Sequence, residues 1–245
     1  MDLLATAVVV AVLAAVAFAI VRALGLEQPW LQPWAILRAV VQLGLLSVVL
    51  TGVIEHPLWV AGFLVLMLLA ASWNVHRRLR LGAGAIPVFA GILLVATAVP
   101  VSLAFGLGAL PPEPRYLLAL GGIVLGNAMT VLTLMGRTMH ERLIAEHELV
   151  EGWLALGATP RRAARDAMRA AASTALVPST DQTRTTGIVT LPGAFVGALF
   201  GGAAPVEAAA FQLVVLAGVL ATGAVTVLLV TWRWGAPKVV PVLPR

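Results

Sequence analysis

The sequence contains no cysteine, and charged side chains make up only 11% of its 245 residues. Without cysteine the chain has no disulfide framework, no thiolate metal site and no thiol nucleophile. An ordinary soluble domain carries roughly 25% charged residues. A chain that is 60% hydrophobic cannot face water over most of its surface. The composition therefore indicates a protein whose solvent is lipid.

Lysine is almost absent as well. A phosphate-binding loop of the form GxxxxGK[ST] requires a lysine, and the single one, Lys238, stands between Pro237 and Val239. The sequence therefore lacks a P-loop. No nucleophile is accompanied by a base and an orienting group, so we expect a non-catalytic chain without a cofactor. Nucleic acid is not expected as a partner.

Long apolar stretches dominate what is present. A helix needs about 20 mostly apolar residues to cross roughly 30 Å of hydrocarbon. The stretches predict an all-α integral membrane protein with about seven transmembrane helices in a single domain over residues 1–245. They cover residues 3–21, 36–54, 58–74, 86–107, 115–135, 187–203 and 206–231. The sixth is the weakest, because Pro192 and Gly193 fall inside it.

Positive charge is unevenly distributed between the predicted loops. With seven spans, every lysine and arginine except Arg115 falls on one side. Cytoplasmic loops carry the excess of positive charge, so we expect the amino terminus outside and the carboxy terminus in the cytoplasm. Removing one span would move about half of these charges outside, which favours an odd number of crossings. The expected location is the plasma or inner membrane, crossed several times.

One long polar interval, residues 136–186, separates the fifth and sixth spans and is predicted to be a helical cytoplasmic segment. Residues 137–156 indicate a helix, with Leu143, Val150 and Leu154 on its apolar face. Gly157 then ends the helix, and a basic helix follows. The new helix has Thr159 as its cap, Pro160 in its first turn, and Arg161, Arg162, Arg165 and Arg169 along its length.

Several polar residues in or beside the spans are open to two interpretations. Arg38 and Gln42 lie one helical turn apart and either line a polar path or let the arginine reach the lipid headgroups. Asn127 and Thr130, with Thr133, form a polar stripe that suits a substrate path or a bond between helices.

The residues before and within the sixth span carry similar alternatives. Asp181 and Arg184 either pair across a helix turn or form a solvated ion pair. Pro192 and Gly193 would leave backbone carbonyls free within a span, which is tolerated only beside protein or a water-filled cavity. His140 and His147 share a helix face with Glu151. That arrangement suits a divalent metal, or simply a solvated surface.

Taken together, these stretches resemble one family, the FetB-like permeases of bacterial iron-export ABC transporters, which are related to plant aluminium-tolerance membrane proteins. The resemblance covers most of the chain. It is carried by Arg38-Ala-Val-Val-Gln-Leu43, Ala71-Ser-Trp-Asn74, Gly126-Asn-Ala-Met-Thr130, Glu151-Gly-Trp-Leu-Ala-Leu-Gly-Ala-Thr-Pro160, Val177-Pro178, Asp181, Thr185, Gly187 and Leu191-Pro-Gly193.

The resemblance implies a permease subunit, forming a homodimer, that pairs with a cytoplasmic ABC ATPase and exports a metal ion such as iron. Membrane lipid is the other expected partner. The expected pathway residues are Arg38, Gln42, Asn74, Asn127, Thr130, Asp181, Arg184, Pro192 and Gly193. The expected ATPase-coupling residues are Leu156, Gly157, Ala158, Thr159, Pro160, Arg161, Arg162 and Arg165. The chain departs from the family at Ala194 and Phe195, where relatives tend to have two methionines.

Two other functions remain open at this point. A stand-alone secondary carrier would move its substrate without an ATPase. A non-transporting scaffold would use its arginines to recruit an acidic protein. Proton-driven carriage is disfavoured because the acidic residues outside the polar interval map to span ends or loops; these are Asp2, Glu27, Glu55, Glu113 and Glu207.

Overall fold

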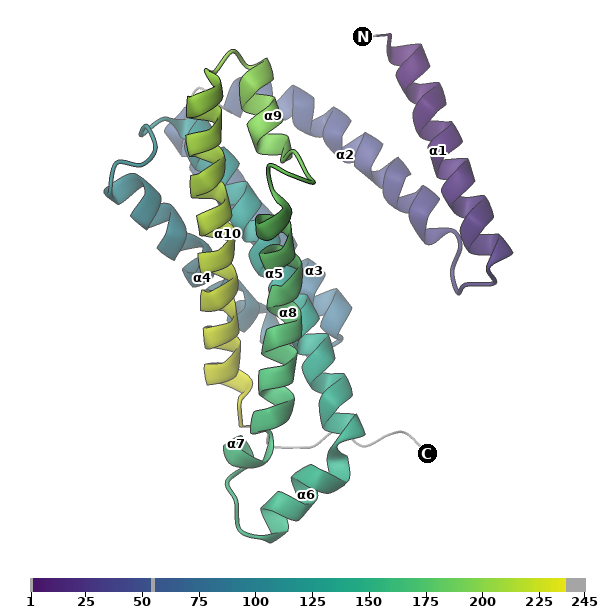
Figure 1. The fold of residues 1–245 in the computed structure, drawn as a ribbon, viewed down its shortest axis with the longest axis vertical. Coiled ribbons are helices and arrows are strands. Elements are labelled where there is room, and N and C mark those ends of the chain that lie inside the picture. Colours follow the sequence, from purple (N-terminus) through teal and green to yellow (C-terminus); the bar gives the residue numbers. More distant parts are fainter. Residues whose placement is uncertain (1, 54–55, 237–245) are drawn as a thin grey trace. The chain divides into compact units, whose positions relative to one another are not determined.

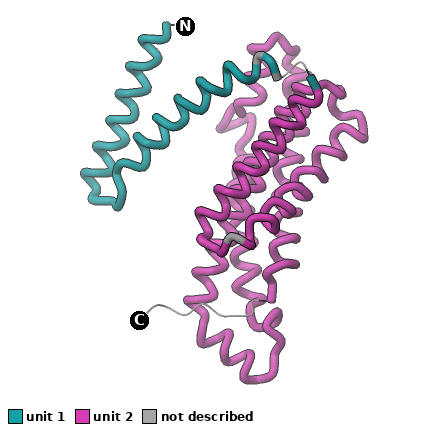
Figure 2. The backbone as a smooth tube through the Cα atoms, turned by 180° about the vertical axis from the view of Figure 1, so that it is seen from behind, with its two compact units in different colours: residues 1–56 teal, residues 57–245 magenta. Residues whose placement is uncertain are grey.

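The computed structural model describes residues 2–53 and 56–236. Three residues used in the predictions on charge lie outside the described residues: Glu55, Lys238 and Arg245. The described part is helical apart from its connecting segments and one isolated bridge, and it contains no strand. The chain divides into two compact units, residues 1–56 and 57–245, which Figure 2 shows in two colours. The single domain expected from the sequence stays a prediction.

The first unit is a pair of apolar helices, α1 (Leu3–Ala23) and α2 (Leu31–Val53), that pack against each other. Asp2 caps α1 by accepting a hydrogen bond from the backbone N–H of Leu4 at 3.0 Å. The rings of Phe18 and Trp30 meet at the turn between the helices, 4.4 Å apart. No residue of α1 is buried. A helix that is apolar all round and uncovered requires lipid or protein beside it.

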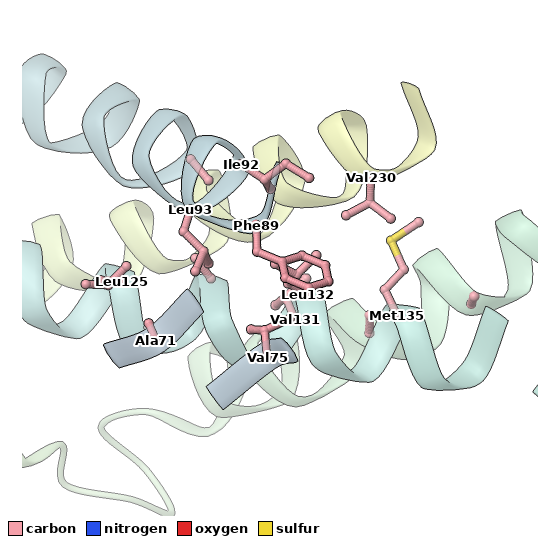
Figure 3. Packing of buried hydrophobic residues seen from close by; sticks show 14 of the residues in the cluster. Ala71, Val75, Phe89, Ile92, Leu93, Leu125, Val131, Leu132, Met135 and Val230 are labelled. Atoms are coloured by element: carbon pink, nitrogen blue, oxygen red, sulfur yellow. The ribbon is translucent and has the colours of Figure 1, made fainter. Parts of the chain in front are cut away.

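The second unit is built around four long helices, α3 (Pro57–Leu79), α4 (Ile86–Gly106), α5 (Pro114–Ala145) and α10 (Pro205–Trp234), with a short 3₁₀ turn, η1 (Ala83–Ala85), before α4. Their facing sides form the core shown in Figure 3, where Phe89, Leu93 and Leu132 are fully buried. Small residues allow close approach. At Gly218 of α10, a Cβ atom would lie only 3.3 Å from Val124 and 3.4 Å from Leu120.

The connection from α5 to α10 passes from one end of this unit to the other. It comprises α6 (His147–Ala155), α7 (Pro160–Ala163), α8 (Arg165–Thr185) and α9 (Gly193–Phe200). In Figure 1, α6 and α7 lie at the end where α5 and α10 finish, while α9 lies beside the beginning of α10. The helix pair α8 and α9 therefore runs the length of the unit, interrupted by residues 186–192.

The prediction of an all-α membrane protein is confirmed, and the number of continuous spans differs. Six helices in the described range are long and apolar enough to cross a membrane: α1, α2, α3, α4, α5 and α10. The predicted sixth span, residues 187–203, is wrong as a continuous helix, because only the 8 residues of α9 are helical there. Gly187 has a φ of +87°, and Pro192 precedes α9 in extended conformation. Both conformations interrupt a helix.

Within the polar interval, the structure agrees with some expectations and corrects others. The helix expected over 137–156 is two helices, α5 to Ala145 and then α6. Leu143 and Val150 are buried as expected, but Leu154 is exposed. Helix α8 packs along the span helices α5 and α10, so the interval 136–186 does not form one separate segment. The cytoplasmic placement of its first part stays a prediction, as does the orientation of the termini.

Candidate functional site

Helix α8 has one polar and one apolar side. Its buried side consists of small or apolar residues, including Met168, Ala171 and Ala175, which belong to the same core cluster as Val131 and Val230. Its exposed side is mostly polar and consists of Arg165, Asp166, Arg169, Ser173, Thr174, Val177, Pro178, Asp181, Gln182 and Arg184. This helix therefore presents a mostly polar strip along the outside of the second unit, with Val177 and Pro178 as its apolar members.

The polar strip reaches the level of the apolar middle of α5. Leu176 lies 3.0 Å from the position that a Cβ atom would take at Gly223, and the same position is 3.8 Å from both Asn127 and Val131. Asp181 stands five residues further along α8, roughly 7.5 Å nearer the far end of the unit. It therefore lies near the middle of the stretch 115–135. Charged groups at such depth face protein or a water-filled cavity rather than lipid.

The end of α8 is closed by its own threonines. The Thr185 hydroxyl donates to the carbonyl of Asp181 at 2.9 Å, and the Thr186 hydroxyl donates to that of Gln182 at 2.7 Å. The chain then folds back, with the N–H of Val189 donating to the Thr185 carbonyl at 2.9 Å. The last carbonyls of a helix otherwise need water or another donor. These bonds allow the helix to stop inside the unit.

Asn127 and Thr130, predicted together, occupy different environments. The Asn127 side-chain amide donates to the backbone carbonyl of Val219 at 2.9 Å and so joins α5 to α10. Thr130 is exposed and donates to Gly126 of its own helix. Thr133 is buried and donates to Met129 at 2.7 Å. Thr130 is thus the member of this stripe that is free to face a substrate.

The remaining predicted pathway residues are dispersed. Asp181 and Arg184 are both exposed, and neither forms an ion pair with any residue that the structure describes. Arg38 and Gln42 are exposed on α2, in the first unit. Asn74 is half-buried on α3 and donates to the Ala70 carbonyl at 2.8 Å.

Pro192 and Gly193 begin α9, beside a cavity. Pro192 is the cap of α9 and Gly193 its first residue. A cavity of about 830 Å³ lies between α9 and the first halves of α5 and α10. Ala194 and Ala198 line it, together with Arg115 and Glu207. The small side chains of Ala194 and Ala198 leave this space open.

The predicted coupling segment forms a protruding turn at the opposite end of the second unit. Gly157 has a φ of +84°, a left-handed conformation that ends α6. The Thr159 side chain caps α7 by accepting from the N–H of Arg162 at 3.4 Å, and Pro160 is the first helical residue. These local predictions are confirmed. Leu156, at the apex, is 83% exposed and Ala158 follows the turn.

Contacts beneath the turn hold it in place. Val150 of α6 packs with Leu143 of α5 and with Ala163 and Ala167 of α7 and α8. The Arg162 guanidinium lies over the Trp153 ring, 5.9 Å from its centroid. The apex is thus an exposed apolar knob with packed residues beneath it.

Four arginines surround a second recess behind this knob. A cavity of about 440 Å³ is lined by Arg161, Arg162, Arg165 and Arg169, and by the end of α10. None of the four pairs with a carboxylate within the described ranges. The surface is therefore strongly positive and suited to an acidic partner.

The histidines do not assemble a metal site. His147 Nδ1 lies 3.6 Å from a Glu151 carboxylate oxygen. No group of three or more potential metal ligands converges among the residues with described positions. The arrangement agrees with a solvated helix face, the second of the two interpretations.

Sequence reasoning missed the polar strip on α8. Its signal is present in the alternation of alanines with polar residues every three or four positions from 165 to 184. That periodicity indicates an amphipathic helix whose apolar side is made of small residues. The segment is too polar overall to be recognised as a helix of the bundle from its hydropathy.

A bundle of apolar helices of membrane-spanning length, with a polar strip along α8 and a protruding turn at one end, defines a multi-pass membrane protein. The chain belongs to a family described as "Uncharacterised protein family (UPF0014)", which matches residues 2–236. The UPF0014 membrane protein STAR2 of Oryza sativa subsp. japonica is 33% identical over 89% of this chain and 76% of its own length. No solved structure matches the chain.

Two further relatives are similar over most of their length. The Arabidopsis thaliana protein named ALUMINUM SENSITIVE 3 is 32% identical over 92% of this chain and 82% of its own length. The Escherichia coli (strain K12) protein named "Probable iron export permease protein FetB" is 30% identical over 80% of this chain and 76% of its own length. The expected family membership is thereby confirmed.

Proposed function

We propose that this chain is the permease subunit of an ABC transporter, and that its substrate, a metal ion such as iron, moves along the polar strip of α8. The observation that carries the proposal is the depth of that strip. Asp181, Gln182 and Arg184 lie near the middle of an apolar bundle, on an exposed surface, where a helix is interrupted. Interrupted helices are a common way to place substrate-binding groups within a membrane.

The name of the E. coli relative supports the choice of substrate class and of export. Oxygen-bearing side chains such as those of Asp181 and Thr130 suit the binding of a hydrated cation. The polar strip is open on one side, so two copies of the chain would enclose it as a homodimer. Arg38, Gln42, Asn74, Pro192 and Gly193 complete the proposed pathway.

Energy would come from a separate ATPase bound at the protruding turn. Leu156 supplies an apolar knob, and Arg161, Arg162 and Arg165 supply positive charge beside it. Helix α7 is followed directly by α8. Movement of the knob in an ATPase groove would therefore reach the polar strip through α7 and α8. The chain itself would remain non-catalytic, in the plasma or inner membrane.

Co-purification tests the partner. The tagged chain is isolated in mild detergent from its own host, and bound proteins are identified by mass spectrometry. We expect an ABC ATPase at about one copy per chain, and its loss in Leu156→Asp. The matched control is Leu107→Asp, since Leu107 is 81% exposed at the opposite end of the second unit. Retention of the ATPase by both variants would contradict docking at the turn.

Transport is tested in proteoliposomes that contain the purified complex, with Fe²⁺ as the probe. We expect flux that requires ATP and falls at least tenfold in Asp181→Asn, while Asp166→Asn, at the start of α8, retains most of it. Flux without any ATPase would indicate a secondary carrier. Partner binding without flux of any ion would indicate a scaffold.

A further inference from the structure

A cavity at the charged end of the second unit is not used by the proposed transport pathway. It lies between the ends of α3 and α10 and the second half of α5, and has a volume of about 690 Å³. Its inner lining is apolar and includes Leu132, Val230 and Trp234. Leu132 is fully buried and Val230 is 1% exposed, so the cavity reaches the packed core.

Close approach of α3 and α5 shapes this cavity. A Cβ atom at Gly136 would lie 2.8 Å from one terminal carbon of Leu79 and 2.9 Å from the other. Glycine therefore lets the Leu79 side chain lie flat against α5, and both residues line the cavity. The shape of the cavity is therefore set by how closely α3 and α5 pack at this point.

The mouth of the cavity is basic. Arg78, Arg80 and Arg137 line it, and all three are exposed. None of them forms an ion pair with any residue in the described part of the chain. His140 and Glu141 are the other titratable residues of the lining. Three arginines against one glutamate leave a net positive rim above an apolar interior.

A basic rim above an apolar interior favours one class of ligand. A small soluble anion would satisfy the arginines and leave the apolar interior uncovered. A zwitterionic lipid would fill the interior but supply no net charge for the rim. The helices pass here from apolar to charged sequence, which is where headgroups lie. An anionic phospholipid matches both the rim and the interior.

We propose that this cavity binds one anionic phospholipid, with its phosphate between Arg80 and Arg137 and part of an acyl chain against Leu132 and Val230. The lining of the site includes no residue of the α8 polar strip and none of the four arginines beside the protruding turn. Guanidinium groups recognise phosphate oxygens through paired hydrogen bonds, which favours arginine over lysine at such a rim.

The test uses the full chain in detergent, with equal amounts of phosphatidylglycerol and phosphatidylcholine added and the retained lipids counted by native mass spectrometry. We expect one phosphatidylglycerol per chain to be retained preferentially. The double variant Arg80→Gln/Arg137→Gln should weaken this preference about 30-fold, given the usual contribution of basic residues to headgroup binding. Arg77→Gln is the matched control, because Arg77 is exposed on α3 and does not line the cavity.

Two outcomes would overturn the proposal. Equal losses in the double variant and in Arg77→Gln would show that the whole basic surface attracts lipid without a defined site. Displacement of the lipid by inorganic phosphate, or equally tight binding of glycerol phosphate, would show a site for the anion alone. A thermal unfolding curve for each variant confirms that the fold is intact before lipids are counted.

Discussion

At the scale of single residues, hydrogen bonds decide which polar groups within the bundle support the fold and which are available for function. The Asn127 amide is committed to the Val219 carbonyl on a neighbouring helix. The Thr130 hydroxyl bonds only within its own turn and is exposed. The sequence places these two residues in one stripe. Substitution by alanine is therefore expected to lower the stability of the protein at Asn127 but hardly at Thr130.

Replacing Asn127 by alanine removes the only side-chain hydrogen bond between α5 and α10 within the described residues. We expect Asn127→Ala to lower the free energy of unfolding by about 0.6 to 1.7 kcal/mol, the range measured for bonds between membrane helices. Thr130→Ala should change it by less than about 0.5 kcal/mol. Denaturant unfolding in detergent measures both. Equal losses would mean that Asn127 does not join the helices.

At the scale of elements, the interruption between α8 and α9 is the feature that distinguishes this bundle from a set of plain spans. Gly187 turns the chain at a φ of +87°, and threonine hydroxyls complete the end of α8. Both devices are local, so they can be tested one residue at a time.

Replacement of Gly187 by alanine places a side chain in the left-handed region. We expect Gly187→Ala to destabilise the protein by about 1 to 2 kcal/mol, the usual cost of that conformation. Gly197→Ala in α9 is the control, because no atom lies within 4 Å of its added Cβ and its helical backbone accommodates alanine. It should be neutral or slightly stabilising. Thermal unfolding in one detergent compares the two. A stable Gly187→Ala would show that the turn tolerates other conformations.

Element prediction from sequence succeeded where a helix is long and apolar and failed where burial depends on small residues. The hydropathy of α1, α3, α4 and α10 is high enough to identify each span. Helix α8 lies along the same bundle with a buried side made mainly of alanines. The charged and hydroxyl side chains of its exposed side lower the hydropathy of the whole segment, so the hydropathy pattern placed these residues in a polar interval although alanines pack closely on the other side.

At the scale of the whole molecule, the sequence argues for an odd number of crossings and the structure contains six membrane-length helices in its described range. The interrupted pair α8 and α9 reconciles the two, since together they lead from one end of the second unit to the other. In this arrangement no seventh continuous helix is needed, and Arg184 is the arginine that moves from the predicted cytoplasmic side into the bundle.

Single cysteines introduced into the cysteine-free chain test this topology directly, because there is no native thiol to label. We expect a membrane-impermeant maleimide added to intact cells to label Leu107→Cys and Phe200→Cys, which are 81% and 89% exposed. Leu156→Cys should react only after the membrane is opened. Labelling of Phe200→Cys and Leu156→Cys from the same side would show that α8 and α9 do not cross.

The functional site was only partly accessible to sequence reasoning, for a physical reason. The turn at Gly157 to Pro160 uses local signals, a left-handed glycine and a capping threonine, that act over a few residues. The polar strip and the basic cavity depend on which helices lie side by side. Arg80 and Arg137 are far apart in sequence and line one cavity only because α3 packs on α5.

Helix α8 is 21 residues long and leads from α7, beside the protruding turn, to the interruption. At 1.5 Å per residue it is a rod of about 32 Å. If one end is held and the rod tilts by about 5°, the other end moves by about 3 Å, close to the diameter of a water molecule. If the proposed function holds, a small rotation at the protruding turn would therefore shift the end of the polar strip by about one water diameter. Because the helix is interrupted before α9, such a tilt of α8 would not have to carry α9 with it.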